Sequence, residues 1–190
     1  MTLAIKIDQN PSNSTFFFEK LKEGPSIEFE IVKKAFESQI APLYGSQEQA
    51  LSKIQTAKDR NSEILFDGAK AVGLLVYKNE LQDEFKKLGV EDSLEIKTLI
   101  VIDPKINSNK GYGSLLINRI IEVAKEKLAK NIHVTVSANA QTSLEFFKKK
   151  KFEIIEKWED KYIKGCTECL LKLSLEKFNN SVENNGSPKI

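Results

Sequence analysis

Apolar residues recur along the first third of the chain with two different periods. Residues 4–9 alternate between apolar and polar side chains, which predicts a strand. Helical spacing then predicts one helix from about Ile31. A second helix is predicted over residues 46–60, because Ser46 is a favourable cap and an acidic residue follows it.

The rest of the chain alternates between strands and helices. A helix is predicted from about residue 112 to 129, because Leu116, Ile120, Ala124 and Leu128 fall on one face and are expected to be buried. A short helix is expected in the polar connection at residues 79–93. Strands are predicted at residues 62–67, 71–78, 94–102, 132–138, 152–158 and 167–175, with a short helix at 141–151.

This order of elements predicts an α/β or α+β fold in which helices cover the faces of a single sheet. The 190 residues, 41% of them hydrophobic, are enough for one domain, which we place at residues 1–175. The polar tail, residues 176–190, is expected to be disordered. The N-terminus resembles no secretory signal and no apolar run is long enough for a membrane helix. We therefore expect a cytoplasmic protein without a membrane partner, although an exported effector would escape this test.

Charge is distributed unevenly, although the net charge is only +2. Residues 1–95 carry 12 basic and 16 acidic groups, a balance of −4, whereas residues 96–190 carry 17 and 11, a balance of +6. The second half therefore favours an anionic ligand. Basic and aromatic residues do not interleave, so we expect no nucleic-acid partner. The two cysteines, Cys166 and Cys169, fit a strand better than a metal site, and no metal is expected.

Two glycines, Gly111 and Gly113, lie between the strand at 94–102 and the helix at 112–129. A glycine turn that opens a helix makes an anion site, because the first N–H groups of the helix have no internal partner. The spacing matches neither a dinucleotide-binding fingerprint nor a phosphate loop that ends in Lys-Ser or Lys-Thr. A bare helix-start turn is the alternative from these residues alone.

The wider stretch "LEIKTLIVIDPKINSNKGYGSLLINRIIEVA" resembles the cofactor-binding core of the GNAT superfamily of acetyl-CoA-dependent N-acetyltransferases. The following stretch "HVTVSANAQTSLEFFKKKKFEII" is similar to the next strand and helix of that family. The resemblance implies a mixed, mostly antiparallel sheet with helices on both faces and a splayed central strand pair. It also implies that acetyl-CoA is the cosubstrate. The residues it places on the cofactor are Leu99, Val101, Ile102, Asn109, Lys110, Gly111, Tyr112, Gly113, Ser114, Asn139 and Phe147.

The same resemblance implies catalytic roles. Glu95 is the candidate general base, and the backbone N–H of Val101 is the candidate donor to the oxyanion. From the residues alone, Glu95 could equally face solvent or pair with Lys97. The family often has a tyrosine as acid where this chain has Phe147, so Tyr162 is kept as a weaker candidate acid.

Two further departures from the family both concern the glycine turn. Ser108 stands where the family usually has arginine or glutamine, and the turn after Pro104 is one residue longer. Asn139 is expected to cap the next helix, and the acceptor pocket is expected to be walled by Trp158, Tyr162 and the helices within residues 31–58. The resemblance thus predicts acetyl transfer to a primary amine of a small molecule or protein. The alternative is an inactive acyl-CoA-binding or interaction module, and a homodimer is possible in either case.

Overall fold

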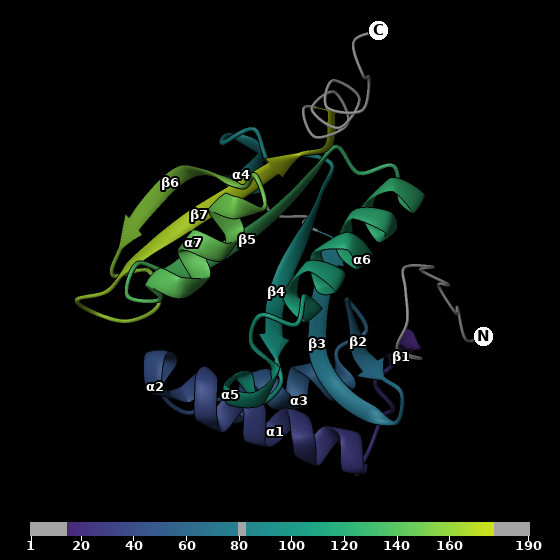
Figure 1. Ribbon diagram of the computed structural model, residues 1–190. Coiled ribbons are helices and arrows are strands. Elements are labelled where there is room, and N and C mark those ends of the chain that lie inside the picture. Colours follow the sequence, from purple (N-terminus) through teal and green to yellow (C-terminus); the bar gives the residue numbers. More distant parts are fainter. Residues whose placement is uncertain (1–14, 80–82, 177–190) are drawn as a thin grey trace, which may run out of the picture. The chain divides into compact units, whose positions relative to one another are not determined.

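The computed structural model describes residues 15–79 and 83–176, whose strands and helices are labelled in Figure 1. The expected strand at residues 4–9 and the tail at 177–190 lie outside the described residues. The elements are β1 (Phe16–Lys20), α1 (Ile27–Gln39), α2 (Ala41–Tyr44), α3 (Glu48–Thr56), β2 (Arg60–Asp67), β3 (Lys70–Asn79), α4 (Asp83–Lys86), β4 (Ser93–Val101), α5 (Pro104–Asn107), α6 (Tyr112–Glu126), β5 (Asn131–Ser137), α7 (Gln141–Lys149), β6 (Glu153–Glu159) and β7 (Thr167–Ser174).

The strands follow the order β1-β2-β3-β4-β5-β7-β6 in one sheet. The pairs β1–β2, β2–β3, β5–β7 and β6–β7 are antiparallel, whereas β4 and β5 are parallel. Within the described residues, the β4–β5 register covers four pairs, from Ser93↔Asn131 to Ile96↔Val134. Both strands run on beyond it, to Val101 and Ser137. The mixed, mostly antiparallel sheet with a splayed parallel pair is therefore confirmed.

The chain divides into two compact units, and β4 and α6 each contribute residues to both. Unit 1 comprises Met1–Lys78 and Lys97–Asn118, and unit 2 comprises Asn79–Ile96 and Arg119–Ile190. The placement of a single domain over residues 1–175 remains a prediction.

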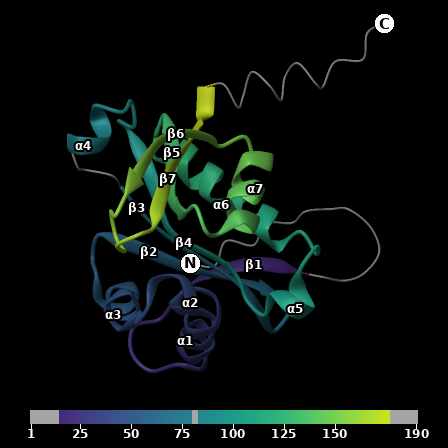
Figure 2. The same ribbon diagram turned by 90° about the vertical axis from the view of Figure 1, so that its left-hand side faces the viewer.

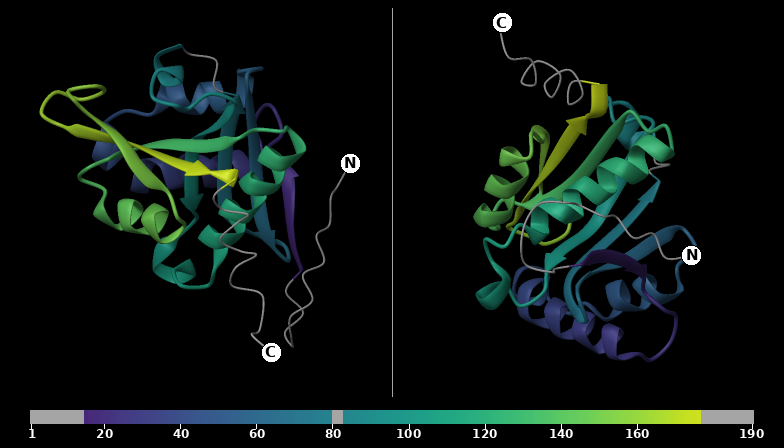
Figure 3. Two further views of the ribbon diagram at one scale, coloured as in Figure 1. Left: turned by 90° about the horizontal axis from the view of Figure 1, so that it is seen from above. Right: turned by 45° about the vertical axis from the view of Figure 1, so that its right-hand side comes forward.

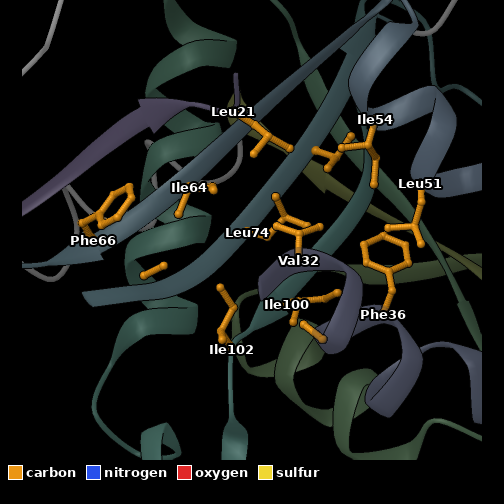
Figure 4. Close-up of a cluster of buried hydrophobic side chains, with 13 residues drawn as sticks. Leu21, Val32, Phe36, Leu51, Ile54, Ile64, Phe66, Leu74, Ile100 and Ile102 are labelled. Carbon is orange, nitrogen blue, oxygen red and sulfur yellow. The ribbon is translucent and has the colours of Figure 1, made fainter. Parts of the chain in front are cut away.

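The core of unit 1 lies between its strands and the helices α1 and α3. Figure 2 shows α1, α2 and α3 gathered beside β1 and β2, and Figure 4 shows the buried side chains that they cover. β2 and β3 carry continuous buried apolar runs, and every second residue of such a run faces α1 and α3, while the apolar residues of α1 keep helical spacing. The cluster consists of Leu21, Val32, Ala35, Phe36, Leu51, Ile54, Ile64, Phe66, Ala71, Leu74, Val76, Ile100 and Ile102.

The first turns of α6 pack on the other face of unit 1. Gly73 alternates with Leu74, so its missing Cβ would point away from α1 and α3. A Cβ built there would lie 3.1 Å from Cδ1 and Cδ2 of Leu116 on α6, and 3.3 Å from Cβ of Leu65. Glycine at this position therefore lets α6 approach the strands closely. The close approach fixes how near the start of α6, which follows the glycine turn, lies to these strands.

Unit 2 contains β5, β7 and β6 with α7, which lies along these strands in both views of Figure 3. The short helix α4 carries Phe85, which is buried in a second cluster with Val90 and Leu170. Leu88, Ile155 and Trp158 pack against that cluster at its edge. Buried polar residues of unit 2, among them His133, lie next to this cluster, since the Phe85 and His133 rings are 5.1 Å apart.

Three helix ends differ from the sequence prediction. Helix α1 begins at Ile27, four residues earlier than expected, because Ser26 accepts a hydrogen bond from the Phe29 N–H at 3.1 Å. The cap of α3 is Gln47 rather than Ser46, and no side chain closes it. The side chain of Asn139 does not cap α7, whose cap is Ala140.

Leu128 was predicted to be buried on α6, but it is 86% exposed. The helix ends at Glu126, and Leu128 takes a left-handed conformation with φ 55°. The N–H groups of Leu128 and Ala129 donate to the carbonyls of Lys125 and Ala124 at 3.1 and 2.9 Å, which closes the helix end. Leu128 continues the apolar spacing of the helix, but the helix itself has already ended at Glu126.

Two further elements were not anticipated, the strand β1 and the short helix α5 that starts at Pro104. No helix among residues 15–79 and 83–176 has the length and apolar character needed to cross a membrane.

Candidate functional site

The last residues of β4 present one polar backbone edge within unit 1. The N–H of Ile102 donates to the carbonyl of Val72 on β3 at 2.9 Å. Because neighbouring residues of a strand point their polar groups in opposite directions, the N–H and carbonyl groups of Leu99 and Val101 point away from β3. The Val101 carbonyl accepts a hydrogen bond at 3.1 Å from Nε2 of Gln39 on α1.

The Gln39 contact was not foreseen from the sequence, because 62 residues separate the two partners. It fixes the peptide that follows Val101, and so restrains the backbone of the residue predicted to donate to the oxyanion. Of the three residues in and just after β4 that were predicted to contact the cofactor, Leu99 and Val101 share the outward edge. Ile102 differs, since its side chain is 8% exposed within the core of unit 1.

The turn after β4 is held by a buried asparagine. Asp103 takes a left-handed conformation with φ 49°, and Pro104 then opens α5. Asn107, 1% exposed, donates from Nδ2 to the carbonyl of Ile102 at 2.6 Å. The side chain of Ser108 donates to the carbonyl of Pro104. The residue that replaces the family's arginine or glutamine therefore bonds to its own turn.

The glycine turn leads directly into the start of α6. Asn109 and Gly111 have positive φ of 62° and 83°, so the turn contains two left-handed backbone conformations before the helix. Leu115 donates to the Gly111 carbonyl at 3.1 Å. The N–H groups of Tyr112, Gly113 and Ser114 therefore precede that intrahelical donor and point out of the helix start, as an anion site requires.

The side chain of Tyr112 points into unit 1 rather than toward a ligand. It is 4% exposed, and its hydroxyl donates to Oδ2 of Asp67 at 2.6 Å. The hydrogen bond to Asp67, together with burial, raises the pKa of Tyr112 to about 12. The ring also meets Phe16 edge-on, with 6.1 Å between centroids. The tyrosine within the motif thus anchors the helix start, and only its backbone is placed to bind.

Glu95 lies in the part of β4 that belongs to unit 2. Its side chain is 4% exposed, so the solvent-facing interpretation is wrong. It lies opposite His133 of β5 in the parallel register. His133 is completely buried, and its Nδ1 is 2.7 Å from Oγ of Ser93 on β4. Glu95 is thus a buried carboxylate in a polar neighbourhood, the setting in which a carboxylate can serve as a base.

The other predicted residues of unit 2 differ in how exposed they are. Phe147 is 5% exposed and meets Phe146 and Phe152 edge-on, with centroid distances of 5.4 and 5.1 Å. Asn139 is exposed, and its Nδ2 lies 3.8 Å from Sγ of Cys166. Tyr162, in the loop between β6 and β7, is 53% exposed. Their predicted contacts with the cofactor or the leaving group remain predictions.

The cysteines fit the strand interpretation. Cys169 is buried within β7 and Cys166 precedes that strand, and both are free thiols. Across residues 15–79 and 83–176, no group of three or more His, Cys, Asp or Glu side chains is placed to hold a metal ion.

Known proteins resemble this chain in fold and not in sequence. No protein-family model matches the sequence, and no curated protein matches it. Solved structures match with high similarity of fold and low sequence identity. Arabidopsis thaliana NAA60 in complex with acetyl-CoA has a TM-score of 0.70 and 14% identity, over 85% of this chain and 99% of that one.

A GNAT family acetyltransferase from Elizabethkingia anophelis with acetyl-CoA bound has a TM-score of 0.60 and 17% identity, over 84% of this chain and 98% of that one. The ribosomal-protein-S18-alanine N-acetyltransferase from Escherichia coli has a TM-score of 0.63 and 11% identity, over 85% and 94%. The chain has the GNAT fold. This confirms the fold that the resemblance implied, and at these identities the likeness concerns the fold alone.

Within this GNAT fold, the predicted site residues separate into two groups. Unit 1 holds the backbone edge of Leu99 and Val101 and the whole turn from Asn109 to Ser114. Unit 2 holds Glu95, Asn139, Phe147 and Tyr162. Sequence reasoning missed Gln39 and the position of His133 beside Glu95. The signal for His133 was its place as the third residue of a β-branched strand in a chain with only one histidine.

Proposed function

We propose that this protein is an N-acetyltransferase that transfers an acetyl group from acetyl-CoA to a primary amine by direct attack. The observation that carries the proposal is the continuous segment Lys97–Asn118 of unit 1. It combines an outward-facing strand edge, a turn with two left-handed residues, and the start of α6, whose first N–H groups precede the first intrahelical donor Leu115. The GNAT fold, with two of the solved neighbours described as acetyl-CoA complexes, supports acetyl-CoA as the ligand of that segment.

Each part of the segment suits one part of the ligand. The N–H groups of Tyr112, Gly113 and Ser114 would bind the pyrophosphate, which a helix start favours through both hydrogen bonds and its dipole. The outward edge of Leu99 and Val101 would pair with the amides of the pantetheine arm as an added strand does. Because backbone groups make these contacts, Ser108 in place of the family's arginine or glutamine does not remove them.

The reaction joins the amine nitrogen to the thioester carbon and breaks the carbon–sulfur bond. Glu95 would accept the proton that the attacking amine loses, directly or through a water. The N–H of Val101 would stabilise the negative charge on the carbonyl oxygen, and such a donor contributes roughly 3 kcal/mol. Gln39 would position that donor, since it binds the carbonyl of the same residue.

The leaving thiolate has no acid at Phe147, because a phenyl ring carries no proton to donate. Tyr162, exposed and in the loop beside Trp158, is the candidate acid among the described residues. Alternatively, the thiolate leaves without protonation. Replacing Tyr162 with Phe separates these routes, because only a true acid would lower turnover when its hydroxyl is removed.

An inactive acyl-CoA-binding module is the second candidate, and the buried Phe147 is the observation that favours it. The buried Glu95 favours the enzyme, because an ionisable group within a sheet costs free energy that a purely structural residue would avoid.

A coupled assay of CoA release and product mass decides between the two. The protein is incubated with acetyl-CoA and a broad panel of primary amines, and acetylated products are identified by mass spectrometry. We expect an acetylated amine in the wild type and its loss in Glu95→Gln, with acetyl-CoA affinity unchanged. Binding of acetyl-CoA without any acetylated amine would favour the inactive module.

A further inference from the structure

Three aromatic rings of unit 2 surround the ammonium of one of the chain's own lysines. Nζ of Lys161 lies 3.4 Å from the ring centroid of Trp158, 5.2 Å from that of Phe85 and 5.8 Å from that of Tyr162. All three distances are within the range in which a cation is attracted to the face of an aromatic ring. We call Phe85, Trp158 and Tyr162 the aromatic box.

Trp158 and Tyr162 are four residues apart on either side of Lys161, whereas Phe85 comes from a distant segment, so only the fold completes the aromatic box. Phe85 is on α4, Trp158 is near the end of β6, and Tyr162 is in the following loop. Phe85 and Trp158 meet edge-on, with centroids 6.1 Å apart and planes at 73°. Phe85 is 3% exposed and fixed in its cluster, while Tyr162 is 53% exposed and forms the open side.

The loop that carries Lys161 has a defined conformation. Asp160 has a left-handed φ of 57°, and its N–H donates to the Cys166 carbonyl at 2.9 Å. The Asp160 side chain accepts from the N–H of Gly165, and the N–H of Cys166 donates to the Ile163 carbonyl at 3.0 Å. These contacts close the loop on itself and hold Lys161 over the Trp158 ring.

A buried carboxylate lies beside the aromatic box. Glu168 of β7 is directly opposite Trp158 in the β6–β7 register, so the two side chains are on the same face of the strands. Glu168 is 0% exposed. Aromatic faces with a carboxylate beside them favour a positive charge on an alkyl chain, which is the chemistry that Lys161 itself supplies.

The aromatic box adjoins the predicted base through one ring. The centroid of Phe85 is 5.1 Å from that of the His133 ring, and His133 lies opposite Glu95. The aromatic box and the Glu95–His133 pair therefore share Phe85 and its ring contact with His133.

We propose that the aromatic box binds an alkylammonium group of the acceptor, and that Lys161 occupies the box as an internal competitor. The inference rests on the proposed function for the chemistry, and it adds the substrate class. An ammonium on aromatic faces stays protonated and cannot be the nucleophile. The acceptor therefore carries two amines, one held in the box and one that is acetylated, as in an α,ω-diamine or a lysine with a free α-amine.

Binding can be measured without acetyl-CoA, because Trp158 is the only tryptophan of the chain. The probe is 1,5-diaminopentane, followed by Trp158 fluorescence, with 1,5-pentanediol as the uncharged control. We expect the diamine, and not the diol, to change the fluorescence. We expect Lys161→Ala to tighten diamine binding about tenfold, since the competing cation is gone.

Lys164 provides the matched control, because it is an exposed lysine in the same loop. Lys164→Ala removes the same charge from the loop and is expected to leave diamine affinity within twofold of wild type. Trp158→Leu, measured by calorimetry, is expected to weaken binding about tenfold. Since Trp158 packs against a core cluster, Tyr162→Ala serves if that variant does not fold, with a smaller loss. Equal diamine affinities in Lys161→Ala and Lys164→Ala would overturn the inference. So would a diamine affinity that is the same in wild type, Trp158→Leu and Tyr162→Ala.

Turnover separates the sources of the diamine. A peptide with a free N-terminus and a lysine near it is compared with the same peptide carrying norleucine, and with free 1,5-diaminopentane against 5-amino-1-pentanol. We expect each diamine to be acetylated with a kcat/KM at least about tenfold above its one-amine analogue. Preference for the peptide identifies a protein acceptor. If no amine is acetylated but the fluorescence results hold, the acetyltransferase proposal fails while the alkylammonium site stands.

Discussion

The candidate site is made of backbone groups in unit 1 and of side chains in unit 2. In unit 1, the candidate cofactor segment consists of backbone groups, and the one aromatic side chain of the turn, Tyr112, is turned inward onto Asp67. In unit 2, the candidate chemistry is in side chains, namely Glu95 beside His133 and the aromatic box around Lys161. We therefore expect substitutions that add atoms to disturb unit 1 most, and substitutions that remove a functional side-chain group to disturb unit 2 most.

The largest expected effect is on the side-chain region. Glu95→Gln keeps the shape of the residue but removes its ability to accept a proton, so we expect kcat/KM for an amine to fall about 100-fold or more. The exposed Glu153 of β6 offers a matched control. Steady-state kinetics should show Glu153→Gln near wild type, and equal activity in the two variants would remove Glu95 from the mechanism.

Adding a single carbon at Gly73 tests the backbone region. The new Cβ would stand 3.1 Å from Leu116, so α6 must shift, and we expect Gly73→Ala to lower the free energy of unfolding by about 1–3 kcal/mol. Thermal unfolding measures the change. In the Leu116→Ala background the same substitution should cost less, and an unchanged cost would show that the helix contact is not responsible.

The hydrogen bond between Tyr112 and Asp67 should make the free energy of unfolding depend on pH above about pH 10. The pKa of Tyr112 is raised to about 12 by its hydrogen bond to Asp67 and by burial, so the folded state keeps its proton longer than the unfolded state. The stabilisation is complete below the unfolded pKa of 10 and is lost as pH rises toward 12. Denaturant unfolding should show a Tyr112→Phe deficit of about 2 kcal/mol at neutral pH that shrinks above pH 10. A deficit that does not depend on pH would contradict this origin.

The smallest of these effects is on cofactor affinity. Gly111 has φ 83° with open space around it, and Gly68 in the β2–β3 turn has φ 57° with open space too. Gly111→Ala and Gly68→Ala should therefore carry similar backbone strain. We expect Gly111→Ala alone to weaken acetyl-CoA binding, by about tenfold, since its Cβ would stand where we propose that the pyrophosphate binds. Calorimetric titration measures both variants, and equal weakening would mean that strain, not the site, is responsible.

The sequence was sufficient for the part of the site that is local. Strand β4, the two glycines and α6 are consecutive, so their patterns alone predict an anion site, and the GNAT resemblance follows from the same stretch. The limits of α6 were harder, because Leu128 continues the apolar period after the backbone has closed the helix. Apolar residues at helical spacing are therefore buried on one face only as far as the backbone hydrogen bonds of the helix continue.

The remaining features depend on tertiary register that no local pattern contains. Gln39 and Val101 are 62 residues apart, and Phe85 and Trp158 come from separate segments. His133 lies beside Glu95 only because β4 and β5 are parallel in that register. Trp158 and Tyr162 were expected to wall the acceptor pocket, which remains a prediction, and the contribution of Phe85 to the rings around Lys161 is not contained in their spacing.

Hydrogen–deuterium exchange with and without acetyl-CoA tests most directly whether unit 1 binds the cofactor through its backbone. With ligand at about a hundred times its dissociation constant, global stability rises by about 2.7 kcal/mol, which gives a uniform background of protection. Above that background, we predict added protection in peptides that cover residues 97–118, with ATP as the control ligand. Saturating acetyl-CoA that leaves the amides of Tyr112, Gly113 and Ser114 exchanging as in the free protein would contradict the account.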